Sequence, residues 1–161
     1  FVLALLWALL VQLGHSLFRR RTGRRSLDRG TVDLLCVDIY CRLTHHYIMG
    51  RGPIPALTAH LRALNLAERY PPTWQLAYAT VNHGLIMATL PWLGRAYAYA
   101  DRAAAMQRRL GDPWHLGMVL QLQAVVYQWT AKIARAAVIL DEAAALTRSL
   151  PQFSSREDWV A

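Results

Sequence analysis

Apolar residues recur at spacings of three and four along most of the chain, which is the period of an amphipathic α-helix. Between residues 31 and 49 this spacing predicts one helix with a buried face made of Val32, Cys36, Ile39, Leu43 and Tyr47. A break at 50–53 follows, and the next predicted helix runs to Tyr70. Its inward residues are Leu57, Leu61 and Leu64, and its outward residues are Arg62, Asn65 and Arg69.

The following four predicted helices alternate in pattern. The stretches 74–90 and 113–129 are apolar on two sides, whereas 93–110 and 133–150 are apolar along one narrow face. The expected buried positions of the two one-sided helices are Leu93, Ala96, Tyr97, Ala100 and Ala104, and Ile133, Ala136, Ala137, Leu140 and Ala144. This alternation is expected when the inner and outer helices of stacked hairpins differ in burial.

Short joints separate the predicted helices. Gly111 suits the left-handed position after a helix end, Asp112 is a good N-cap, and Pro113 is favoured at the first helical position. Similar joints occur forty residues earlier, at 70–74, and forty residues later, at Leu150-Pro151. The sequence therefore predicts a repeat array.

A shift of forty residues also aligns many identical residues, including small alanines that allow helices to approach closely. The aligned pairs include Ala56/Ala96, Ala63/Ala103, Ala96/Ala136, Ala103/Ala143, Asp101/Asp141, Arg95/Arg135 and Arg108/Arg148. We therefore expect an all-α, TPR-like, right-handed superhelix of stacked antiparallel hairpins with a period of about forty residues. Its hairpins would span 31–70, 72–110 and 113–150 within a single domain, 1–161, and Ser155 would open an eighth helix.

Residues 1–18 form an apolar run, interrupted near its end by polar residues and followed by arginines. We interpret this run as the leading helix of the array, covering the helix at 31–49. The alternative is a membrane span, because a mainly apolar run of eighteen residues before a basic stretch fits the positive-inside rule. Residues 19–29 hold six arginines and one aspartate, so five of the eight net positive charges are local. The chain is 55% hydrophobic, which suits either interpretation.

Two segments, 60–69 (HLRALNLAER) and 109–114 (RLGDPW) with Leu120-Gln121-Leu122, resemble the tetratricopeptide-like region of large bacterial signalling ATPases. The likeness covers roughly 1–161, since Leu13-Gly14-His15-Ser16-Leu17-Phe18 is similar to the helix that precedes those repeats. Many such ATPases carry a class III nucleotide cyclase or a protein kinase domain. The resemblance implies a sensor or scaffold region, with any catalysis in other parts of a larger protein.

The motifs of common enzyme classes do not occur in the sequence. A phosphate-binding loop needs a lysine after a glycine-rich stretch, and the single lysine, Lys132, follows Ala131. Gly14-His15-Ser16 begins like a nucleophile elbow but ends in Phe18 rather than glycine. The cluster of Asp38, Cys41 and His45, with Cys36 and His46 nearby, has metal-ligand spacing, but we favour a small buried cysteine and helix-end histidines. We expect no cofactor and no metal.

The predicted function is a non-enzymatic protein-interaction, sensor or scaffold module, in the cytoplasm because both cysteines are expected to be reduced. Its partner would be another protein or other domains of a larger chain. No nucleic acid is expected, because no aromatic residues interleave the arginines of 19–29. The alternatives are a membrane-anchored helical protein and a self-association element, and the oligomeric state stays open. The candidate partner-binding residues on the inner helices are Tyr40, Tyr47, His83, Met87 and Tyr127.

Overall fold

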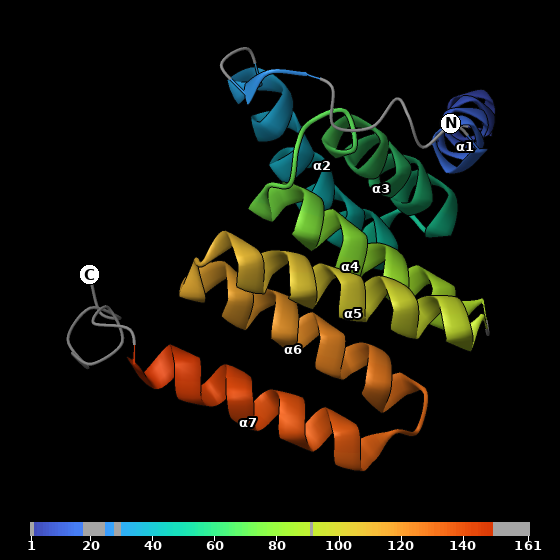
Figure 1. Ribbon diagram of the computed structural model, residues 1–161. Coiled ribbons are helices and arrows are strands. Elements are labelled where there is room, and N and C mark those ends of the chain that lie inside the picture. The colour runs from blue at the N-terminus through green and yellow to red at the C-terminus, as the bar shows by residue number, and fades with distance from the viewer. Residues whose placement is uncertain (1, 18–24, 28–29, 91, 150–161) are drawn as a thin grey trace. The chain divides into compact units, whose positions relative to one another are not determined.

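The protein is all-helical over the part of the chain that the structure describes. The computed structural model describes residues 2–17, 25–27, 30–90 and 92–149. These residues form seven α-helices and no strand: α1 (Val2–Leu17), α2 (Thr31–Gly50), α3 (Pro53–Ala67), α4 (Trp74–Thr89), α5 (Leu93–Leu110), α6 (Pro113–Trp129) and α7 (Ile133–Ser149) (Figure 1). The all-α class is thereby confirmed. The predicted joint at Leu150-Pro151 and the predicted eighth helix lie outside the described residues.

The chain divides into two compact units, Phe1–Ala79 and Thr80–Ala161. In the first unit, α3 is the central helix because it packs against both α1 and α2. Small residues along α3, among them Ala56, Ala59, Ala63 and Ala67, are buried and permit this close approach from two sides. The expectation that the leading helix covers the helix at 31–49 is wrong, since the contacts of α1 within the described residues are with α3.

One hydrogen bond accounts for a second correction in α3. Asn65, predicted to point outward, is buried, and its side-chain Nδ2 donates to the Ala8 carbonyl oxygen at 2.9 Å. The periodic pattern predicts that a polar asparagine is exposed, but here the side chain hydrogen-bonds the backbone of a neighbouring helix. The polar side chain thus joins α1 to α3.

The buried face of α2 differs from the predicted one. Val37 and Cys41 are buried, whereas Val32 and Ile39 are 71% and 46% exposed. Apolar residues occur around much of the circumference of α2, so more than one row of them has helical spacing. Because successive residues are rotated by about 100°, neighbouring rows face different directions. α2 is less buried than α3.

α3 ends at Ala67, before the end predicted at residue 70, and Tyr70 packs against the start of α2. The Tyr70 side chain is buried, and its hydroxyl donates to Asp33 Oδ2 on α2. Arg25 pairs with the same carboxylate at 3.0 Å, and its backbone N–H donates to the Arg69 carbonyl at 2.9 Å. A Cβ atom built on Gly30 would lie 2.8 Å from the Tyr70 ring, so the glycine admits the ring. These contacts fix the segment that leads into α2.

In the second unit, α6 packs against both α5 and α7 (Figure 1). Accordingly, α6 is buried over much of its circumference, as its two-sided pattern predicts. α5 buries one face that includes Ala96, Ala100 and Ala104 of the predicted set, together with Ala103. Leu93, also predicted to be buried, is 41% exposed. α7 also buries one stripe, but it consists of Ala136, Ile139 and Ala143, while Ile133 and Leu140 are exposed. The predicted α7 face is therefore wrong by about one residue's rotation.

The forty-residue register correctly relates buried positions in three helices. Ala56, Ala96 and Ala136 are spaced forty apart and are all buried, on α3, α5 and α7. Ala63, Ala103 and Ala143 form a second buried set with the same spacing. A side chain larger than alanine at these positions would push the neighbouring helix away.

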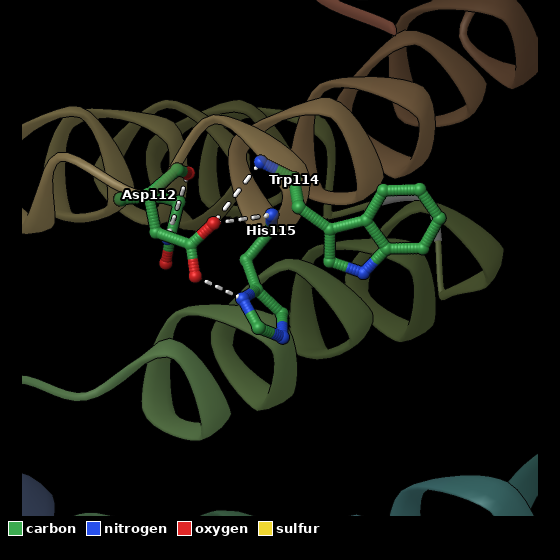
Figure 2. Close-up of polar contacts among 4 residues, drawn as sticks. Asp112, Trp114 and His115 are labelled. Atoms are coloured by element: carbon green, nitrogen blue, oxygen red, sulfur yellow. Dashed lines mark hydrogen bonds and ion pairs between the residues drawn. The ribbon is translucent and has the colours of Figure 1, made fainter. Parts of the chain in front are cut away.

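The joint between α5 and α6 has the predicted geometry (Figure 2). Gly111 adopts the left-handed conformation with a φ of 75°, and Pro113 is in the first turn of α6. Asp112 Oδ1 accepts the backbone N–H groups of Trp114 and His115 at 3.0 and 3.3 Å, and Asp112 Oδ2 contacts His115 Nδ1. The carboxylate thus caps two backbone donors that the helix itself leaves without partners.

Candidate functional site

α1 carries the largest run of exposed apolar side chains on a described helix. One side of α1 faces α3: Ala8 is buried, and His15 Nδ1 lies 2.7 Å from Glu68 Oε2. The opposite side exposes large side chains at helical spacing, with exposed fractions between 52% and 83%. This outer face of α1 consists of Leu3, Leu6, Trp7, Leu10 and Leu13.

The outer face of α1 carries no formal charge, because the sixteen residues of α1 include no Asp, Glu, Lys or Arg. Monomeric proteins seldom expose contiguous apolar surface of this kind, and such patches commonly mark interaction sites. The sequence contained the signal for this surface, since residues 2–11 are apolar on all sides of the helix. Sequence reasoning identified the run but not which side stays uncovered.

The five residues predicted to bind a partner are divided between the two units of the chain. Tyr40 and Tyr47 belong to α2 and are half-buried, and the Arg62 guanidinium carbon lies 6.0 Å from the centre of the Tyr40 ring. His83, Met87 and Tyr127 belong to the second unit and are 7%, 6% and 9% exposed. These three side chains therefore offer little area to a partner.

His83 is part of the packing between α4 and α5. Its ring meets the Tyr99 ring edge-on, with centroids 4.6 Å apart. Burial, with a smaller effect of the Arg95 charge, lowers the pKa of His83 to about 4. The imidazole is therefore neutral at pH 7, and it acts as a packed polar aromatic side chain.

Tyr127 belongs to a polar cluster that sequence reasoning did not find. Its ring stacks on Tyr97 with centroids 5.0 Å apart, and its hydroxyl donates to both carboxylate oxygens of Asp101 at 2.9 and 3.0 Å. Burial first, and then the Asp101 carboxylate, raise the pKa of Tyr127, whereas the Arg135 charge acts in the opposite direction. In the sequence, Asp101 was noticeable only as a repeat partner of Asp141.

The cluster with metal-ligand spacing on α2 is occupied by other interactions. Burial raises the pKa of the Cys41 thiol to about 12, with a smaller effect of the Asp38 charge. Asp38 pairs with Arg42 at 3.1 Å, and His45 Nδ1 lies 3.0 Å from the Cys41 carbonyl oxygen. Within the described part of the chain, no three His, Cys, Asp or Glu side chains gather closely enough to hold a metal ion. The described helices also include none with the length and hydropathy that crossing a membrane requires.

Comparison with known proteins gives no relative: no protein-family model, no curated protein and no solved structure matches the chain. The functional argument therefore depends on the chain's own residues.

Proposed function

We propose that the protein is a non-enzymatic helical-repeat module that binds another protein through the outer face of α1. The observation that carries this proposal is the uncharged apolar surface of Leu3, Leu6, Trp7, Leu10 and Leu13 on a helix whose other side already packs on α3. Burying apolar surface is worth about 25 cal/mol per Å², so covering these side chains gives a binding partner a substantial gain.

The chemistry of the partner follows from the position of α1 at the edge of its unit. A helical array that ends in solvent needs a polar outer face on its last helix. α1 has an apolar outer face instead, as a helix does when another helix packs on it. We therefore infer that the partner contributes an apolar helix face, which packs on the outer face of α1 as the other side of α1 packs on α3.

The forty-residue register supports the proposal that the helices form a TPR-like right-handed superhelix. Alanines at equivalent positions of α3, α5 and α7 are buried, as expected for repeated hairpins that use the same close contacts. The resemblance of 60–69 and 109–114 to the repeat region of large bacterial signalling ATPases suggests a setting for such a module. In that setting, the module would act in the cytoplasm as a sensor or scaffold for a cyclase or kinase.

The experiment compares a variant of the outer face with a matched variant elsewhere. Tagged wild-type protein, Leu6→Gln/Leu10→Gln and Ile133→Gln/Leu140→Gln are produced in the cells that naturally make the chain. All four substituted side chains are exposed, so each variant should keep the wild-type melting temperature. We expect the α1 variant to lose a bound protein that the wild type and the α7 variant both retain, as quantified by mass spectrometry.

Two other measurements distinguish the alternatives. The wild type is compared with the α1 variant by flotation with phosphatidylcholine–phosphatidylglycerol vesicles. Flotation of the wild type alone would show that the outer face of α1 binds a membrane surface instead of a protein. Sedimentation velocity that shows a wild-type dimer and a monomeric α1 variant would make the outer face an interface between two copies. Equal sets of bound proteins for the wild type and both variants would contradict any role for the outer face.

A further inference from the structure

The second unit contains a polar cleft formed by α5, α6 and α7. The residues of this cleft are distant in sequence from the outer face of α1 and belong to a different unit.

 The cleft volume is about 190 Å³. The cleft is lined by Asp101, Arg108, Gln123, Arg135, Val138, Ile139 and Glu142.

One buried hydrogen-bond acceptor in this lining has no donor. Gln123 is 4% exposed, and its Nε2 donates to Asp101 Oδ1 at 2.7 Å. That bond fixes which end of the amide is the oxygen, and Gln123 Oε1 is buried without a hydrogen-bond partner among the described residues. Gln123 therefore acts on the cleft through Nε2, which holds Asp101 Oδ1 in place.

The charges of the lining separate into a satisfied pair and two groups without an ion pair. Arg108 Nη2 donates to both carboxylate oxygens of Glu142, at 2.8 and 2.9 Å. Among the described residues, Asp101 receives hydrogen bonds from the neutral groups of Gln123 and Tyr127. Neither Asp101 nor Arg135 forms an ion pair with any residue that the structure describes. The cleft thus presents one negative and one positive group for a ligand.

We propose that this cleft binds a small zwitterion of the α-amino-acid class. Asp101, held in place by Gln123 Nε2, accepts hydrogen bonds from the ligand's ammonium group, and Arg135 donates to the ligand's carboxylate. Val138 and Ile139 supply an apolar wall, which suits an aliphatic side chain. The cleft has room for about six water molecules at ~30 Å³ each, so a small amino acid fits and a nucleotide does not. This inference is independent of the outer face of α1.

Calorimetric titration of the full chain tests the proposal with three matched probes. L-Valine carries both charged groups, isobutylamine lacks the carboxylate, and isovalerate lacks the ammonium. We expect L-valine to bind and each analogue to bind about tenfold more weakly or worse, because each loses charge-assisted hydrogen bonds.

Variants assign the two ends of the ligand. Arg135→Gln should weaken L-valine binding about tenfold and leave isobutylamine binding unchanged, whereas Arg148→Gln, on the same helix, should change neither. Gln123→Met should weaken both amine-bearing probes, and Gln121→Met, at an exposed position of α6, serves as its control. Arg135 is exposed, so its variant remains informative even if Gln123→Met unfolds. Isobutylamine binding as tightly as L-valine, or no L-valine binding at about 10 mM, would overturn the proposal.

Discussion

A Cβ atom built at Gly84 of α4 would lie 3.0 Å from the backbone carbonyl oxygen of Ala96 on α5. It would also lie 3.3 Å from the Ala100 backbone nitrogen, so backbone atoms, rather than movable side-chain ends, surround the site. Gly84 therefore lies at a close approach of these two helices, and a methyl group there requires a shift of one helix.

Gly84→Ala should destabilise the protein by about 1 to 3 kcal/mol, because overpacking outweighs the gain in helix propensity. Gly117→Ala on α6 is the matched control, since the nearest atom outside its own helix would be the Thr147 hydroxyl oxygen at an ordinary 3.7 Å. The control should gain about 0.5 to 1 kcal/mol. Urea unfolding measures both, and two variants of equal stability would contradict the close approach at Gly84.

Two adjacent alanines test the orientation of α7. Ala136 is buried and Ala137 is exposed, although the sequence pattern placed both inward. We expect Ala136→Leu to destabilise the protein by about 1 to 3 kcal/mol and Ala137→Leu to change its stability by less than about 0.5 kcal/mol. Thermal or urea unfolding gives the comparison, and the reverse order would restore the face predicted from the sequence.

The Asp112 cap should contribute measurably to the α5–α6 joint. Asp112→Ala removes the acceptor of two backbone N–H groups and should cost about 1 kcal/mol at pH 7, whereas Asp141→Ala, at an exposed position inside α7, should cost less. Burial opposes the carboxylate, but hydrogen bonds from His115 and Trp114 and the His115 charge outweigh it and lower the pKa of Asp112. The contribution of the cap is therefore lost as the pH falls through this lowered pKa. An Asp112→Ala effect that does not diminish in acid would argue against the cap.

His83 should make the second unit sensitive to mild acid. Its pKa is about 4 in the folded protein and about 6.5 when unfolded, so between these values the unfolded chain binds the proton and the folded chain does not. Stability is therefore retained above pH 6.5 and falls by about 3 kcal/mol as the pH approaches 4. The loss should shrink in His83→Phe and persist in His46→Gln, an exposed control on α2. Urea unfolding at pH 7 and pH 4 measures the loss of stability in the wild type and both variants. Identical losses of stability in all three proteins would contradict a buried neutral His83.

The sequence was most informative where a single residue type determines the local geometry. Gly111, Asp112 and Pro113 each suit one position of a helix joint, and the structure places them there. The buried alanine sets were predictable for a related reason, because only a small side chain fits a close helix contact. These features need no knowledge of the neighbouring helix.

Helix orientation was less predictable because it depends on which neighbour packs where. α2 and α7 have more apolar residues than their neighbours cover, so several rows fit the same periodicity and only packing chooses among them. Asn65 and Gln123 were missed as interior residues for a similar reason, since their partners, the Ala8 carbonyl and Asp101, lie on other helices. The outer face of α1 required the knowledge that α3 covers only one side.

The most direct test of the α1 docking surface is a photo-crosslinking scan along that helix. A benzophenone amino acid is placed singly at Leu6, Leu10 and Leu13 on the outer face, and at Ile133 and Leu140 of α7 as exposed controls. The account predicts that all three α1 positions crosslink to one apolar helix of the same partner protein, mapped by mass spectrometry, and that the α7 positions do not. Crosslinks to that partner from α7 at equal yield, or none from the α1 positions, would contradict it.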